Sequence, residues 1–147
     1  MLIDQCLGRR GVAAALVADG ATVRLHADEF EADAADADWL PIAGARGWIV
    51  VTKDVNLRKR PLELAAILAA RLRVFALTSA QLGGAQQAQA FAAAAKKMRR
   101  VSRQRGPFIG FVSPSGAVTV EYARALTRRL RRLRATGRSV QSDLVSS

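Results

Sequence analysis

The sequence predicts an α/β fold, in which a parallel sheet has helices on both faces and is followed by a C-terminal hairpin and a basic helix. Three observations support this fold class. Short apolar runs alternate with helical stretches through the first half of the chain. The helical stretches supply the crossover connections that parallel neighbours need. The second half then changes to two short strands around a turn and a helix rich in arginine.

Four stretches of the first half have the character of strands, because each is short, apolar and bounded by polar or turn residues. The fourth is apolar along nearly its whole length, which is typical of a strand covered on both faces. The four are MLIDQ, ATVRLH, WIVVT and RVFALT, at residues 1–5, 21–26, 48–52 and 73–78.

Helical stretches separate these strands. Apolar residues recur at helical spacing in RGVAAALVADG, DADWLPIAGARG and RPLELAAILAARL, at residues 10–20, 36–47 and 60–72. Pro41 is expected near the first turn of the second helix, where proline is tolerated, and Pro61 starts the third. Residues 27–35 are polar and irregular, so we expect a loop there.

The second half begins with a long alanine-rich helix over residues 85–104, which Gly106 and Pro107 end. Two short strands around a Pro-Ser-Gly turn predict a hairpin over residues 108–122. The last helix starts at residue 123, with a leucine stripe and arginines around it. We predict a single domain over residues 1–138 and a frayed or disordered tail over residues 139–147.

The composition bounds the class of protein. With 147 residues, half of them hydrophobic, the chain is long enough for one domain with a substantial core. Cys6 is the only cysteine, so no internal disulfide can form and a reducing, cytoplasmic compartment is expected. No apolar run approaches the roughly 18 to 20 residues that cross a membrane, so no membrane association is expected.

Charge is distributed unevenly along the chain. Residues 1–54 hold 5 Lys or Arg against 9 Asp or Glu, whereas residues 55–147 hold 18 against 3. The two halves therefore carry −4 and +15, within a net charge of +11. A basic body with its acids gathered at one end indicates a polyanion partner, with a cation such as a metal between the acids and that partner. The alternative is that both biases only solvate the surface.

Three aspartates are the candidate functional residues. Ligands of an open parallel sheet bind beyond the carboxyl ends of its strands, and Asp4 and Asp54 follow the first and third strands. At about 100° per residue, Asp36 lies about 60° from Trp39 on the inward stripe of its helix. Carboxylates gathered at one point repel unless hard divalent cations neutralise them, which predicts a site for Mg²⁺ or Mn²⁺ that hydrolyses phosphodiesters.

Simpler interpretations stay open for these acids. Asp36 or Asp38 could be the N-cap of its helix, and Asp54 could be a turn residue that ends its strand. Glu29 lies among other acids in the predicted loop, whose main role could be solvation. His26 is expected to be a packing residue at a strand end. With no second histidine and one cysteine, the chain has no support for a zinc site or a Cys-His nucleophile pair. It also has no P-loop, dinucleotide-binding or serine-hydrolase motif, so nucleotide hydrolysis of the P-loop kind, dinucleotide binding and serine hydrolysis lack support.

At these residues the chain resembles a known family, the PIN-like domains of VapC-type toxins. The resemblance covers residues 2–78 and rests on LIDQCLG, VRLHADEF, DADWL, RGWIVVTKD and RPLE, with the second acid in a D-x-x-W-L helix. It implies a PIN fold whose acids bind Mg²⁺ or Mn²⁺ and cut RNA, a cognate antitoxin that holds the toxin inactive, and a possible homodimer. The family's acids match Asp4, Asp36 and Asp54.

The chain departs from the family pattern at two positions. Many PIN domains carry a fourth acid shortly after the third, where this sequence has Asn56. An amide oxygen can bind a metal but brings no charge, so one well-held metal is easier to support than two. Asp38 stands where the small bacterial subgroup with the D-x-x-W-L helix commonly has Glu. The secondary candidates for the metal site are Asp38, Asn56 and Glu29.

Basic clusters are the candidates for binding RNA, because phosphate contacts give affinity without base specificity. The cluster nearest Asp54 in sequence is the best placed, and Lys53 could meet the phosphate or simply be solvated. The arginines of the last helix could bind RNA or only solvate a helix that packs through its leucines. The RNA-binding candidates are Lys53, Arg58, Lys59, Arg60, Lys96, Lys97, Arg99 and Arg100.

The sequence therefore favours a metal-dependent endoribonuclease that acts as the toxin of a toxin and antitoxin pair. One alternative is a nucleic-acid-binding module that keeps the fold without catalysis. Another is a receiver-like phosphoacceptor domain, since an acid after the first strand and an aspartate after the third also fit that plan. Receivers need an acid pair at the first strand, and Ile3-Asp4 offers one acid.

Overall fold

The computed structural model describes residues 1–3, 11–31, 33–53, 55–79 and 81–146. Its centre is a six-stranded sheet in the order β2-β1-β3-β4-β5-β6. The strands β1 to β5 run parallel to one another, and β6 is antiparallel to β5. The strands are β1 (Leu2–Ile3), β2 (Arg24–Leu25), β3 (Ile49–Thr52), β4 (Arg73–Leu77), β5 (Phe108–Val112) and β6 (Val118–Tyr122).

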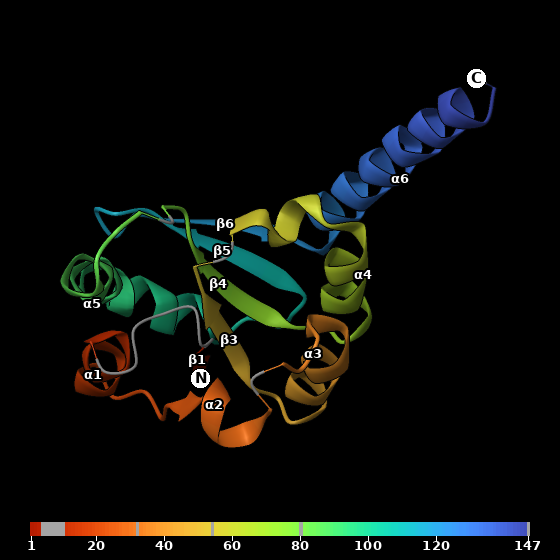
Figure 1. Cartoon of the computed structure of the whole chain (residues 1–147). Coiled ribbons are helices and arrows are strands. Elements are labelled where there is room, and N and C mark those ends of the chain that lie inside the picture. Colours follow the sequence, from red (N-terminus) through yellow and green to blue (C-terminus); the bar gives the residue numbers. More distant parts are fainter. Residues whose placement is uncertain (4–10, 32, 54, 80, 147) are drawn as a thin grey trace.

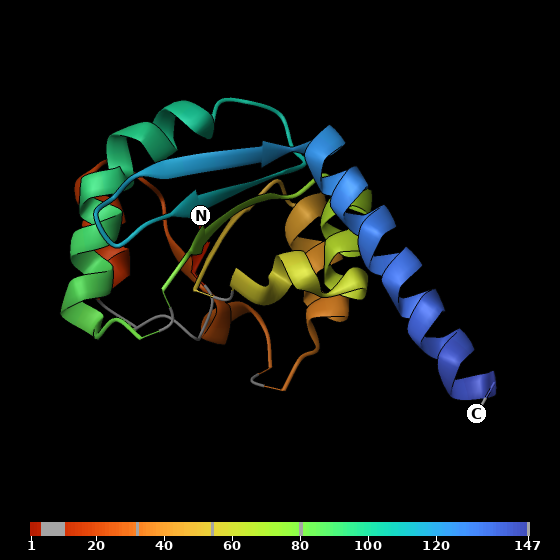
Figure 2. The same cartoon turned by 90° about the horizontal axis from the view of Figure 1, so that it is seen from above.

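Helices cover both faces of this sheet, as Figures 1 and 2 show. One face carries α1 (Gly11–Ala18) and α5 (Gly84–Val101), which pack against each other. The other carries α3 (Asp36–Ala45), α4 (Pro61–Ala69) and the first part of α6 (Ala123–Ser146). The rest of α6 projects away from the body (Figures 1 and 2). The predicted α/β architecture is confirmed.

The alternation of side chains along the strands produces two cores. Val74 and Ala76 of β4 pack under α3, α4 and α6, whereas Phe75 and Leu77 pack under α1 and α5. This follows from the pleat, because successive side chains of a strand point to opposite faces. β4 is buried on both faces, and its continuous apolar run is explained by that position.

The structure corrects two local predictions. A one-turn helix, α2 (His26–Glu29), takes the last residue of the strand predicted over residues 21–26, which is reduced to Arg24–Leu25, and the start of the loop predicted over residues 27–35. This helix is too short to produce a helical pattern in the sequence. Pro41 is the sixth residue of α3 and lies beyond its first turn. Because proline has no backbone N–H, one helical hydrogen bond is lost at Pro41. The buried side chains of Trp39 and Leu40 pack α3 against the core and keep the helix in place.

The remaining α-helices differ from the predicted ones only in where they begin or end. A short 3-10 helix, η1 (Val55–Lys59), joins β3 to α4, and Pro61 is the first residue of α4 as predicted. The long alanine-rich helix begins at Gly84 and ends at Val101. The backbone of α6 is helical through Ser146, and so continues into residues 139–147, for which the sequence predicts a frayed or disordered tail.

Two edges of the sheet matter for function. We call the edge where the parallel strands end the carboxyl edge, and the opposite one the amino edge. η1 leaves β3 at the carboxyl edge. α5 ends at the amino edge, because the guanidinium of Arg73, at the start of β4, donates a 2.6 Å hydrogen bond to the carbonyl of Ser102. The two edges are separated by the length of β4, about 16 Å for five residues.

Candidate active site and basic surfaces

The register of the sheet brings the ends of β1 and β3 together at the carboxyl edge. Ile3 pairs with Val51 on one side and with Leu25 of β2 on the other. Ile3 directly precedes Asp4, and Val51 lies three residues before Asp54. Asp4 and Asp54 themselves lie outside the described residues. Their strands are nonetheless adjacent and parallel, as the prediction of a shared acid site requires.

Asp36 is the first residue of α3, and its side chain is outside the description. The N-cap of α3 is Ala35, with φ −69° and ψ 146°, and no side chain caps the helix. The backbone N–H of Asp38 donates to the carbonyl of Ala35 at 2.9 Å, so Asp38 is already within the first turn and its side chain is exposed. The N-cap interpretation of Asp36 and Asp38 is therefore wrong. A carboxylate in a first turn is still favoured by the helix dipole.

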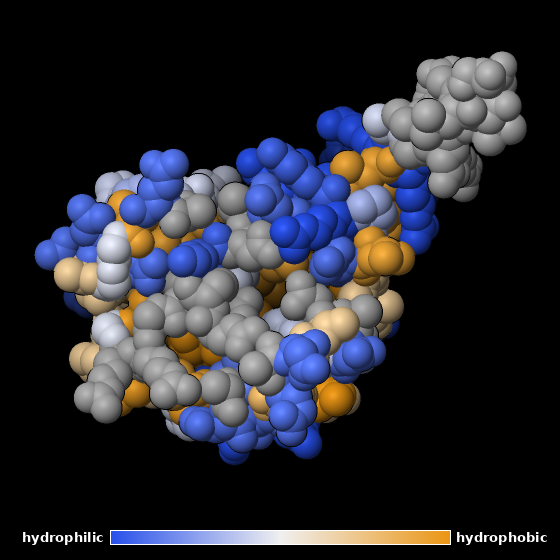
Figure 3. Space-filling model, in the orientation of Figure 1, coloured by the Kyte–Doolittle hydropathy of each residue, from blue (hydrophilic) through white to orange (hydrophobic). Residues whose placement is uncertain are grey.

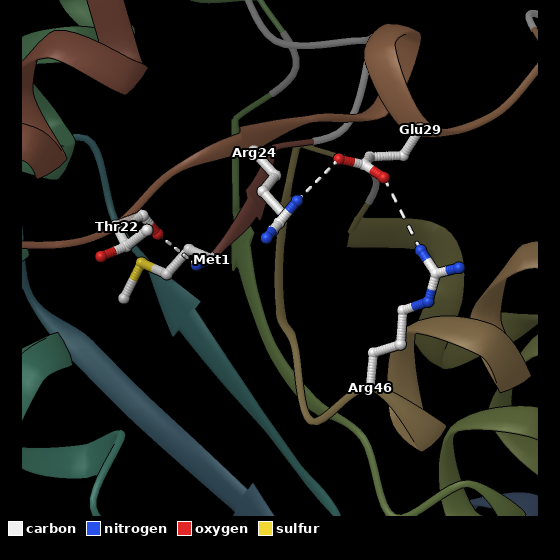
Figure 4. Close-up of polar contacts among 5 residues, drawn as sticks. All are labelled: Met1, Thr22, Arg24, Glu29 and Arg46. Carbon is white, nitrogen blue, oxygen red and sulfur yellow. Dashed lines mark hydrogen bonds and ion pairs between the residues drawn. The ribbon is translucent and has the colours of Figure 1, made fainter.

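Glu29, a secondary candidate for the metal site, is bound by two arginines (Figure 4). Arg24 Nη1 donates a 3.0 Å hydrogen bond to Oε1, and Arg46 Nη1 lies 3.6 Å from Oε2. The guanidinium carbons of Arg24 and Arg46 lie 5.3 and 4.9 Å from the centre of the Trp48 ring. Both oxygens of Glu29 thus have cationic partners, and a metal would have to compete with them.

His26 is enclosed by aromatic rings. Its ring lies 5.2 Å from that of Phe30 and 4.9 Å from that of Trp39, and the residue is 1% exposed. Neither ring nitrogen has a hydrogen-bond partner among the described residues. This arrangement agrees with the packing role predicted for His26.

The donor set expected for a metal consists of carboxylate oxygens, which suit hard divalent cations. Within the described part of the chain, no group of three His, Cys, Asp or Glu residues could hold a metal ion. That search does not reach Asp4, Asp54 or the side chain of Asp36. The assignment of the three aspartates therefore stays a prediction, which the adjacency of β1 and β3 supports.

The basic cluster nearest this edge lies on η1 and the residue after it. Lys59 and Arg60 are exposed, and Arg58 places its guanidinium carbon 5.1 Å from the centre of the Phe111 ring. Asn56 is exposed on the same helix, and Lys53 is half-buried where β3 ends. Figure 3 shows hydrophilic side chains gathered over η1. This cluster therefore lies next to the end of β3, with two exposed cationic side chains at Lys59 and Arg60.

The second basic cluster lies elsewhere. Lys96, Lys97, Arg99 and Arg100 occupy the last turns of α5, which ends at the amino edge, and all four are exposed. Arg99 is partly engaged, because its Nη1 donates a 3.3 Å hydrogen bond to the carbonyl of Asp19. The predicted RNA-binding residues therefore divide between two edges of the sheet.

Sequence reasoning missed a third basic group. Arg71, Arg73, Arg103 and Arg105 line one hollow at the amino edge. A signal for this group exists in the sequence. Arg71 lies two residues before β4 and Arg73 begins it, whereas Arg103 and Arg105 lie five and three residues before β5. These strands are parallel neighbours, and Arg73 pairs with Phe108. Residues that come just before adjacent parallel strands meet at the same edge.

Comparison with known proteins identifies the family. A family model described as a PIN like domain matches residues 1–79, which span β1 to β4 and include the three predicted aspartates. The chain belongs to the PIN-like domain family. The resemblance noted in the sequence and the mostly parallel sheet are both accounted for by this membership.

A curated relative extends the comparison beyond the PIN-like match. The chain is 33% identical over 100 residues to a Mycobacterium tuberculosis protein named "Putative ribonuclease VapC45", and the alignment covers 67% of this chain and 72% of that one. No solved structure matches the chain. Within the described residues, no helix is long and apolar enough to span a membrane.

Proposed function

We propose that this PIN-like protein is a metal-dependent endoribonuclease and the toxin of a type II toxin-antitoxin system. The observation that carries the proposal is the parallel pairing of Ile3 with Val51 at the carboxyl edge, inside the segment that matches the PIN-like family. The name of the mycobacterial relative, a ribonuclease, supports an RNA substrate, and the resemblance to VapC-type toxins implies an antitoxin partner.

Asp4, Asp36 and Asp54 are the proposed ligands of Mg²⁺ or Mn²⁺. A bound divalent cation would polarise the scissile phosphate and make water a better nucleophile at neutral pH. The three carboxylates would supply the negative charge that holds such a cation near an RNA backbone. Asp38 and Asn56 remain secondary candidates, and the two arginine partners of Glu29 make it the weakest of the three.

The cluster on η1 has the proposed role of positioning the RNA. Lys59 and Arg60 can contact phosphates next to the acids, and Lys53 directly precedes Asp54 in sequence. Arg58 keeps its guanidinium over Phe111, which restricts its reach and makes it more a part of the fold than its neighbours. Contacts of this kind bind any RNA backbone, so sequence preference must come from other contacts.

The proposal is tested by cleavage of a mixed RNA pool by the purified protein, with Mn²⁺ and with EDTA. Asp4→Asn, Asp36→Asn and Asp54→Asn are compared with Asp33→Asn, which makes the same change at an exposed loop residue. We expect cutting in Mn²⁺ that EDTA abolishes, a loss in each of the first three variants, and near-normal cutting by Asp33→Asn.

Binding of the RNA in EDTA distinguishes the alternative function. A protein that binds RNA in a salt-sensitive way and cuts under no condition is a nucleic-acid-binding module, and the nuclease proposal falls. Cutting that survives Asp4→Asn and Asp54→Asn in folded protein would place the chemistry outside the predicted acids. Circular dichroism of each variant checks that it is folded.

A further inference from the structure

We propose that the hollow lined by Arg71, Arg73, Arg103 and Arg105 binds phosphates of the RNA backbone, as a second contact surface remote from the acids. The hollow has a volume of about 340 Å³ and is completed by Gln104 and Gly106. It lies at the amino edge, whereas the acids follow strands that end at the carboxyl edge. The inference rests on the proposed function, because it concerns the substrate of that site.

Three of the four arginines are available to a ligand. Arg71, Arg103 and Arg105 are exposed, and within the described part of the chain no ion pair or hydrogen bond engages the guanidinium group of any of them. No acid is among the residues that line the hollow, so the lining itself does not neutralise its arginines. Unpaired guanidinium groups that converge on one hollow attract a ligand with several negative charges.

Arg73 is held in position for such a ligand. Its Nη1 donates a 2.6 Å hydrogen bond to the carbonyl of Ser102, and its Nη2 donates a 2.9 Å hydrogen bond to the carbonyl of Gly47. A guanidinium has five N–H donors, so about three remain free. Because these two hydrogen bonds already fix the guanidinium, the side chain of Arg73 loses little further conformational entropy when a ligand binds.

The segment before β4 and the segment before β5 lie against each other at the hollow. A Cβ on Gly106 would lie 2.2 Å from the carbonyl oxygen of Arg71, so only glycine lets the loop before β5 lie this close to the start of β4. The backbone N–H of Phe108 donates a 3.0 Å hydrogen bond to the carbonyl of Leu72. Arg103 and Arg105 are thereby held beside Arg71 and Arg73.

The lining favours RNA over a protein partner. Its side chains are four arginines and one glutamine, with no apolar or aromatic residue among them. Protein interfaces bury an apolar or aromatic centre, whereas a nucleic-acid backbone offers regularly spaced phosphates that arginine binds through paired hydrogen bonds. Lys96, Lys97 and Arg100 are exposed on the last turns of α5 at the same edge and extend the positive surface.

The position of the hollow has a consequence for RNA length. The two edges are separated by about 16 Å, the length of a five-residue strand. A short oligonucleotide bound at the acids does not reach the hollow, whereas a longer or folded RNA can contact both. RNA that is long enough to contact both edges at once therefore gains more affinity from the hollow than a short oligonucleotide bound at the acids does.

The test is binding of uncut RNA in EDTA, measured by fluorescence anisotropy over a series of salt concentrations. An Arg103→Gln/Arg105→Gln double variant is compared with Arg124→Gln/Arg128→Gln, which removes the same charge from exposed positions of α6. We expect the hollow variant to bind long RNA about ten-fold more weakly, with a salt slope reduced by roughly 1.4 to 1.8 for two lost contacts. Binding of an oligonucleotide too short to span the distance of about 16 Å between the two edges is expected to weaken less, because it cannot contact both edges at once. Arg71→Gln provides an independent single variant.

Equal binding of long RNA by the hollow variant and the α6 variant would overturn the proposal, whether both match the wild type or both are weakened. Calorimetry with inorganic triphosphate tests a small anion as the natural ligand. Tight triphosphate binding that Arg103→Gln/Arg105→Gln abolishes, without an effect on RNA, would also overturn it. Because these measurements need no cleavage, their outcome is independent of the test of the proposed nuclease.

Discussion

Arg24, the first residue of β2, forms an ion pair with Glu29, the last residue of α2. The N–H of Arg24 Nη1 donates to Glu29 Oε1 at 3.0 Å, and Arg46 approaches the other carboxylate oxygen from the end of α3. Both guanidinium groups also stack on Trp48. Glu29 thus links three segments through one carboxylate. Its position suits a structural role better than a metal ligand.

Replacement of Glu29 tests that distinction. Glu29→Gln keeps the shape and an acceptor oxygen but removes the charge that both arginines contact. We expect cleavage in Mn²⁺ within a few-fold of the wild type, and a loss of at most about 1 kcal/mol in the free energy of unfolding, because Arg24 and Arg46 are half exposed. Cleavage assays and urea denaturation measure the two effects. A loss of cutting as large as that of Asp4→Asn would make Glu29 part of the metal site.

The attachment of α6 depends on a bidentate contact. Nη2 of Arg129 lies 2.6 and 2.7 Å from the two carboxylate oxygens of Glu121 on β6, and Nε donates to Oε1 at 3.2 Å. We expect Arg129→Met to lower the free energy of unfolding by about 1 kcal/mol, since paired contacts of partly exposed groups are stronger than single ones. Urea denaturation measures this loss.

A double-mutant cycle with Glu121→Gln isolates the coupling between Arg129 and Glu121. Arg128→Met serves as the matched control, because Arg128 is exposed on the same helix. The control is expected to change stability by less than about 0.5 kcal/mol. A coupling energy near zero would mean that the leucine stripe alone holds α6 on the body.

The amino group of Met1 gives the stability a pH dependence. Burial lowers the pKa of this amine below 8.0, and the nearby charges of Arg24 and Arg73 lower it further. The unfolded chain therefore binds more protons than the folded protein between the folded pKa and 8.0. By linkage, the contribution of this group to stability rises with pH through that window and is constant above it. Urea denaturation over a pH series measures the slope, and Nα-acetylated protein with the same slope would contradict its assignment to Met1.

Much of the fold was predictable because its strands are short apolar runs between clear helix and turn signals. β4 shows this best, since burial on both faces leaves a continuous run of Val74, Phe75, Ala76 and Leu77. α2 was not predictable, because one turn of helix cannot show a period of 3.6 residues. The position of Pro41 was also missed, because packing through Trp39 and Leu40 outweighs the local cost of the proline.

The candidate site was predictable only in part, for a topological reason. Asp4 and Asp54 follow strands whose parallel pairing could be inferred, and the pairing of Ile3 with Val51 agrees with that inference. The arginine partners of Glu29 come from separate segments, at Arg24 and Arg46, so no sequence pattern around Glu29 predicts these ion pairs. The arginine hollow likewise needs β4 and β5 to be neighbours, which the sequence order alone does not require.

Gly110 is a core position whose constraint comes from the neighbouring strand. It pairs with Phe75 in the parallel register, and a Cβ at residue 110 would lie 2.6 Å from Cδ1 of that ring. The ring has little room to move, because it is fully buried and packs edge-on against Phe108 at 5.5 Å. We expect Gly110→Ala to lower the free energy of unfolding by about 1 to 3 kcal/mol through overpacking.

Gly84→Ala is the matched control for Gly110→Ala. Gly84 is the first residue of α5, and a Cβ there would have no heavy atom within 4 Å. Alanine at this helical position is expected to leave stability unchanged or to raise it by up to about 1 kcal/mol, because glycine loses more backbone entropy on folding. Urea denaturation of both variants gives the comparison. If Gly110→Ala proved as stable as Gly84→Ala, the Phe75 ring would have to be able to move away from β5. The close packing of β4 against β5 would then not explain why residue 110 is glycine.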